Sequence, residues 1–164
     1  MPLFQNPDIL YVIAEVAVTI TGFTAIGAVF RRRQGQWDRP ERILFLVLMR
    51  TSLIVLFFAF VPWLVGQAVN SVDFVWRISC GLYGLMQLID VTWYLRHKAG
   101  EPTRGQKILA PLGFVNVTAQ FLVAAGILGP GPLVYVAGLL FLMYVSIHNF
   151  VLLLIIGLDK HPKD

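Results

Sequence analysis

Long apolar segments, separated by short charged connections, occupy most of this 164-residue chain. Five of them exceed the roughly 20 residues that an α-helix needs to cross the hydrocarbon core of a bilayer. Only 13% of the residues are charged, about half the fraction of a typical soluble domain. The sequence therefore predicts an all-α integral membrane protein with one transmembrane domain over residues 1–164, formed by five transmembrane helices at about 8–30, 40–69, 73–95, 108–128 and 132–158.

The positively charged residues predict how the spans are oriented. The connections after the first and third spans are rich in arginine and lysine, and Lys160 and Lys163 lie in the C-terminal tail. The connections after the second and fourth spans, QAVNSV and GPGP, contain neither residue type. Basic connections stay on the cytoplasmic side, so we expect the N-terminus outside and the C-terminus in the cytoplasm. Because the net charge of +4 follows this distribution, it does not indicate a nucleic-acid partner.

Local patterns agree with these boundaries. Asp38 and Glu41 form a D-x-x-E capping pattern at the start of the second span. Large aromatic residues near span ends are typical of the membrane–water interface. They are Tyr11, Trp63, Trp76 and Tyr135 on the outer side, and Trp93 and Tyr94 on the inner side.

Charged side chains inside the spans are the most informative residues. Each costs at least ~2.5–3.5 kcal/mol at the centre of a membrane helix unless it is paired or hydrated. In the run LVLMRTSLIVLFF, Arg50 lies about 12 Å from the inner boundary, and Asp90 lies about 9 Å from the same boundary. A short connection makes their two spans antiparallel neighbours, so the sequence predicts an Arg50–Asp90 pair. Such a pair either clamps two helices or belongs to a functional pathway, and both readings stay open.

A second predicted pair joins Glu15 and Arg77, which both lie within about 6–11 Å of the outer boundary. Glu15, Thr19 and Gly22 share one helical face, which could line a pore or hold a close helix contact. A stripe of small residues with a four-residue repeat indicates helix packing. Its members are Ala17, Thr21 and Ala25.

Further polar residues fall in the inner half of the spans. Asn116 lies in the fourth span, His148 lies in the fifth, and Gln87 is one helical turn from Asp90. Taken singly, Asn116 and Gln87 are best read as helix-to-helix hydrogen bonds, worth ~0.6 kcal/mol each. Taken together, the layer predicts a hydrated cavity. His148 could gate that cavity or relay protons, because histidine changes charge in the physiological pH range.

The first span reads Ala14-Glu15-Val16-Ala17-Val18-Thr19-Ile20-Thr21-Gly22-Phe23, and Arg31-Arg32-Arg33, Trp37 and Asp38-Arg39 follow it. This stretch resembles a group of small bacterial inner-membrane proteins whose first helix carries A-E-x-A-x-T-x-x-G-F before a basic loop. The resemblance covers about the first third of the chain. It implies the bacterial inner (cytoplasmic) membrane and draws attention to Glu15, Thr19, Gly22 and Phe23. The group has no assigned activity, so the resemblance implies no mechanism.

The sequence contains no G-x-S-x-G, H-E-x-x-H, C-x-x-C or P-loop pattern, and Cys80 is its single cysteine. We therefore expect no catalytic residues, metal or cofactor, and favour a protein that is not an enzyme. Three hypotheses remain, in order of preference. They are an oligomeric ion channel or transport protein, an accessory or assembly subunit of a larger membrane complex, and a lipid- or quinone-binding membrane protein or enzyme. The expected partners are membrane lipids and either further copies or another membrane subunit.

Overall fold

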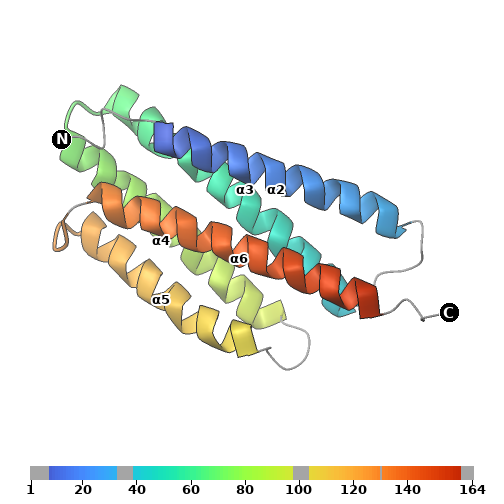
Figure 1. The fold of residues 1–164 in the computed structure, drawn as a ribbon. Coiled ribbons are helices and arrows are strands. Elements are labelled where there is room, and N and C mark those ends of the chain that lie inside the picture. The colour runs from blue at the N-terminus through green and yellow to red at the C-terminus, as the bar shows by residue number, and fades with distance from the viewer. Residues whose placement is uncertain (1–7, 33–38, 98–103, 130, 160–164) are drawn as a thin grey trace.

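The computed structural model describes residues 8–32, 39–97, 104–129 and 131–159, and every regular element in these ranges is an α-helix. The helices run up and down, each antiparallel to its neighbour in the chain (Figure 1). The predicted all-α class is confirmed. The helices are α2 (Asp8–Arg32), α3 (Arg39–Ala68), α4 (Val72–His97), α5 (Arg104–Ala124) and α6 (Gly131–Asp159).

Four of the described helices are long and apolar enough to cross a membrane. The apolar stretches are Asp8–Gly27, Glu41–Ala68, Lys107–Ala124 and Gly131–Ile155. The helix α4 is not among them, and it carries the charged residues Asp73, Arg77, Asp90 and Arg96. Four of the basic residues behind the predicted orientation lie outside the described residues, as does the predicted cap Asp38; they are Arg33, Lys98, Lys160 and Lys163.

The end of α5 differs from the sequence prediction. The fourth span was predicted to continue to Leu128, but α5 ends at Ala124. Gly126 adopts a positive φ of 75°, a left-handed conformation that glycine tolerates better than other residues. The amides of Gly126 and Ile127 then donate to the carbonyls of Val123 and Leu122, both at 2.9 Å, and this pattern caps the helix. The apolar run alone does not reveal this stop, because Ile127 and Leu128 extend it past the glycine.

The helices α3 and α6 form the centre of the bundle. The helix α6 contacts the other four helices, and α3 contacts α2, α4 and α6. The helix α2 packs against α3 and α6, whereas α5 packs against α4 and α6 (Figure 1). As a result, α2 and α5 form two opposite edges of the bundle. We call the half that contains the C-terminal ends of α2, α4 and α6 the inner half, after the predicted orientation, and the other half the outer half.

Aromatic side chains fill the core of the outer half. Tyr83 and Tyr135 are fully buried, with ring centres 5.5 Å apart. Trp76 lies 5.7 Å from Tyr135, and Phe58 lies 5.3 Å from Tyr83. The Tyr83 hydroxyl donates to the carbonyl of Gly138 at 2.7 Å, and the Tyr135 hydroxyl donates to the carbonyl of Phe58 at 2.6 Å. Each buried hydroxyl therefore has a partner, as a core tyrosine requires.

This cluster corrects the interfacial placement of two residues. Trp76 and Tyr135 lie near their helix ends, as predicted, but they face the core and not the membrane interface. Tyr11 and Trp63 are 46% and 57% exposed, as an interfacial aromatic residue should be. Distance from a helix end is readable in the sequence, but the direction in which a side chain points depends on the neighbouring helices.

Gly138 allows α6 to approach the tyrosine cluster closely. A Cβ atom there would lie 2.7 Å from Cε1 of Tyr83 and would also clash with the amide nitrogen of Gln120. We expect Gly138→Ala to destabilise the protein by about 1–3 kcal/mol, as overpacking of a core does. Gly66→Ala is the matched control, because nothing lies within 4 Å of a Cβ at that position. Chemical unfolding of both variants in detergent measures the difference, and equal stability would contradict the close packing.

Candidate functional site

The predicted pair between Arg50 and Asp90 is confirmed. The Arg50 Nε lies 2.8 Å from Oδ1 of Asp90, so the pair joins α3 to α4. The two side chains are 26% and 10% exposed. The guanidinium also lies over the ring of Trp93, 4.9 Å from its centre, which adds a cation–π contact. Both the counter-charge and the ring stabilise a cation that would otherwise be costly among apolar side chains.

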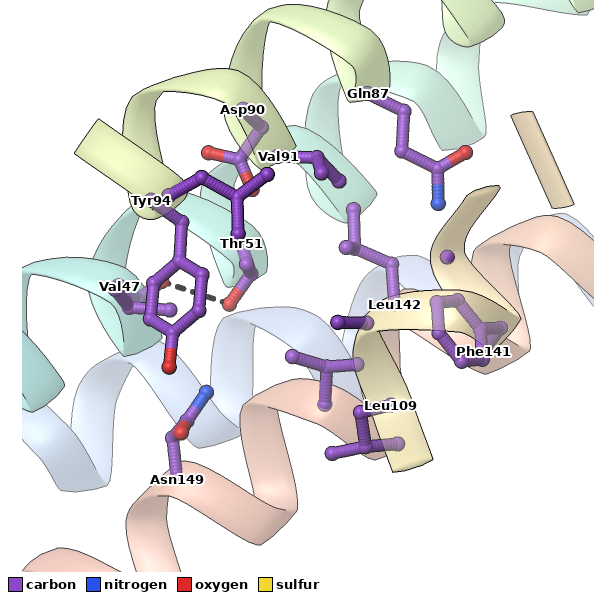
Figure 2. Close-up of a pocket in the computed structure, with 14 residues that line it drawn as sticks. Val47, Thr51, Gln87, Asp90, Val91, Tyr94, Leu109, Phe141, Leu142 and Asn149 are labelled. Carbon is purple, nitrogen blue, oxygen red and sulfur yellow. Dashed lines mark hydrogen bonds between the residues drawn. The ribbon is translucent and has the colours of Figure 1, made fainter. Parts of the chain in front are cut away.

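A cavity of about 80 Å³ lies beside the pair in the inner half. It is mostly apolar, but Thr51, Gln87, Asp90, Tyr94 and Asn149 contribute polar groups (Figure 2). These residues come from α3, α4 and α6, and α5 completes the wall. In Figure 2 the Tyr94 hydroxyl and the Asn149 amide point toward one another at one end of the cavity. A cavity of this size with several polar partners can hold water.

A chain of amide side chains connects the cavity to α5 and α6. The Nδ2 of Asn116 donates to Oε1 of Gln87 at 3.2 Å. The Nε2 of Gln120 donates to the carbonyl of Val134 at 2.9 Å and, more weakly, to Oδ1 of Asn116 at 3.4 Å. The interpretation of Asn116 and Gln87 as helix-to-helix hydrogen bonds is confirmed. Within the described part of the chain, the Nε2 of Gln87 is buried without a hydrogen-bond partner.

A second polar contact joins the two central helices. The hydroxyls of Thr51 and Ser146 lie 2.7 Å apart, and both residues are buried. The sequence did not single out Thr51, although it directly follows Arg50. Its signal was weak, because a threonine in a membrane helix can bond its own backbone, as Thr51 also does with the carbonyl of Val47 at 2.8 Å.

His148 lies beside this layer without lining the cavity, although its neighbour Asn149 does line it. Its ring stacks on Tyr144 with the centres 6.3 Å apart. The Nε2 of His148 is buried and has no hydrogen-bond partner among the described residues. No group of three His, Cys, Asp or Glu side chains in the described ranges is arranged to hold a metal ion.

The predicted pair between Glu15 and Arg77 does not form within the described chain. Arg77 lies 3.6 Å from Asp73, one turn earlier on α4, and its guanidinium lies over Phe74 and against Gly126. The prediction was wrong because similar depth does not place two residues on facing sides. The helix α2 packs on α3 and α6, away from the corner where α4 meets the end of α5.

Glu15 instead lies on an exposed face of α2. Thr19 and Gly22 share this face, and both are exposed. The Thr19 hydroxyl donates to the carbonyl of Glu15 at 2.8 Å, and nothing lies within 4 Å of a Cβ built on Gly22. The neighbouring stripe of small residues, predicted to pack against another helix, differs in burial along its length. Ala17 is buried, Thr21 is half-buried and Ala25 is exposed.

No protein family model matches the chain, and neither a curated protein nor a solved structure is significantly similar to it.

Proposed function

We propose that the protein is an oligomeric ion-transport protein of a bacterial inner membrane, in which several copies place the exposed face of α2 around a shared pathway. The observation that carries the proposal is the position of Glu15. This carboxylate lies about 10 Å from the start of α2, within an apolar stretch, and faces away from its own bundle. A charge in that position is costly in contact with lipid. Surrounding it with further copies and water removes that cost.

The same proposal includes α4 as a fifth span, with the N-terminus outside. Its 26 residues measure about 39 Å, enough to cross the ~30 Å hydrocarbon core. Its charges lower its hydropathy, but Asp73 pairs with Arg77, and Asp90 pairs with Arg50. The helix α4 packs antiparallel to α3 and α5, which are both apolar enough to span. If these two helices cross the membrane, α4 crosses it beside them.

The packing of one copy favours a pathway between copies over a pathway through one copy. In the outer half, Tyr83, Tyr135, Trp76 and Phe58 fill the space between α3, α4 and α6. Copies related by rotation can form a closed ring, and exposed faces of the same helix then meet around its axis.

Each polar element has a place in this proposal. A ring of Glu15 carboxylates at the outer side attracts cations, with Thr19 and Gly22 below it on the same face. The inner cavity with Asp90 forms a hydrated recess in each copy, where His148 lies close by. The Arg50–Asp90 pair holds α3 and α4 together and so keeps the shape of that recess.

A second candidate function is that of an accessory subunit in a larger membrane complex. It is favoured by the polar contacts between helices, such as Thr51–Ser146 and Asn116–Gln87, which are typical of a static scaffold. The Glu15 face would then meet a different membrane protein. Purification from its native membrane under mild conditions distinguishes the two, because a scaffold retains a stoichiometric partner and the proposed oligomer retains only further copies.

The proposed pathway along α2 is testable by the rate at which single cysteines on that helix react with a water-soluble reagent. In a Cys80→Ala background, Glu15→Cys and Thr19→Cys should react with a membrane-impermeant thiol reagent at least about tenfold faster than Val115→Cys, because thiols react as thiolates in water. Val115 is 66% exposed on α5 at the opposite edge, so it serves as the lipid-facing control. Equally slow labelling at all three positions in reconstituted protein would contradict a pathway along α2.

A further inference from the structure

An apolar groove runs along the outside of the bundle between α3 and α4. Its volume is about 530 Å³, and Leu46, Leu53 and Phe57 on α3 and Met86 on α4 line it. These three α3 side chains are 42–60% exposed, so the groove lies on the surface that lipid contacts. From Leu46 to Phe57 it extends about 16 Å, which is close to half of the ~30 Å hydrocarbon layer. The groove therefore has the length of an acyl chain in one leaflet.

The inner end of the groove is basic. Arg50 lines it, with its guanidinium over Trp93, which also lines it. Arg42 lies one turn before Leu46 on the same face of α3, and its side chain is exposed. Arg96 follows Trp93 by three residues on α4 and is also exposed. Two adjacent helices therefore each place an arginine where the groove reaches the membrane surface.

We propose that this groove binds an anionic phospholipid of the inner leaflet. One acyl chain lies along Leu46, Leu53 and Phe57, and Arg42 and Arg96 hold the phosphate of the headgroup. Arginine suits this role because its planar fork donates two parallel hydrogen bonds to a phosphate. Trp93 lies at the level where indole rings favour the boundary between chains and headgroups. Arg50 is already paired with Asp90, so the net positive charge at this end of the groove comes from Arg42 and Arg96.

This inference rests on the proposed orientation, with the N-terminus outside, but not on the proposed ion transport. The groove lies between α3 and α4, whereas the proposed pathway follows the exposed face of α2. A phospholipid could be bound whether or not the protein conducts ions.

Native mass spectrometry of the purified protein tests the site, with phosphatidylglycerol and phosphatidylcholine of identical acyl chains as probes. We expect phosphatidylglycerol to remain bound at concentrations where phosphatidylcholine is lost. Removing each cation should weaken its binding about fivefold, so Arg42→Gln with Arg96→Gln should weaken it by well over tenfold. Lys107→Gln is the matched control, because Lys107 lies three residues into α5 at the same end of the bundle but away from the groove.

A second variant tests the apolar part without changing any charge. Leu53→Trp partly fills the groove and should weaken the binding of both lipids. Equal retention of the two lipids by the wild-type protein would overturn the proposal. A loss of phosphatidylglycerol in Lys107→Gln as large as in the single variants Arg42→Gln and Arg96→Gln would also overturn it, because the effect would then be that of net charge. Matching unfolding temperatures ensure that the variants compare folded proteins.

Discussion

Replacing Asp90 with asparagine is expected to destabilise the protein by about 3 kcal/mol, because it leaves the half-buried Arg50 guanidinium without its counter-charge among apolar side chains. The two groups lie 2.8 Å apart, and Asp90 is only 10% exposed. Asparagine keeps the shape of the side chain, so the effect reports the lost charge and not a cavity. Chemical unfolding in detergent measures it.

The double variant separates a net stabilising contribution of the pair from the cost of leaving one charge alone. Arg50→Met with Asp90→Leu removes both charges and keeps apolar volume, so it should be closer to wild type than either single change. Asp73→Asn is the control, because it breaks an exposed pair with Arg77 and should cost less than about 1 kcal/mol. A double variant as unstable as the sum of the two single changes would contradict a coupled pair.

Replacing Glu15 with glutamine is expected to reduce cation flux by at least about tenfold, because a ring of carboxylates that attracts cations loses all of its charge when every copy is changed. Glutamine keeps the size and polarity of the side chain. Glu15→Asp should retain most of the flux, since it keeps the charge. Asp73→Asn should also retain it, because Asp73 is exposed in the outer half but lies on α4, away from the α2 face.

An equal loss of flux in Glu15→Gln and Asp73→Asn would contradict this expectation. The surface charge of the outer side would then control conduction. The α2 face then has no particular role.

The sequence was sufficient to predict features that depend on composition or on how far a residue lies from the end of its helix. The helices follow the apolar segments, because burying a charge in hydrocarbon is costly enough to confine most charges to the connections. The Arg50–Asp90 pair was predictable for the same reason. The short connection between α3 and α4 makes them antiparallel neighbours, and counting residues from each end places both groups at one depth.

Features that depend on direction around a helix were not predictable. Glu15 and Arg77 lie at similar depths, but α2 packs where it cannot bring Glu15 to Arg77, and Asp73 is available one turn away. Tyr135 lies near a helix end, yet it points into the core, where the carbonyl of Phe58 accepts its hydroxyl. A helix that is apolar on all sides carries little information about which side its neighbours cover.

The sequence predicted a cavity within a polar layer, but it identified only some of the polar residues that line the cavity. Asp90 and Gln87 were recognised, but Thr51 and Tyr94 were not, although both line the cavity. Threonine and tyrosine are common in membrane helices without a site, so their presence is a weak signal. Their contribution becomes clear only when four helices are brought together.

Ion flux into liposomes that contain the purified protein tests the central claim most directly. Wild-type protein and Glu15→Gln should be reconstituted at equal density, with empty liposomes beside them. We predict cation flux in the wild type well above that of empty liposomes, and its loss in Glu15→Gln. Wild-type flux equal to that of empty liposomes, across several ions and pH values and with folded, oligomeric protein, would contradict ion transport and favour the accessory-subunit function.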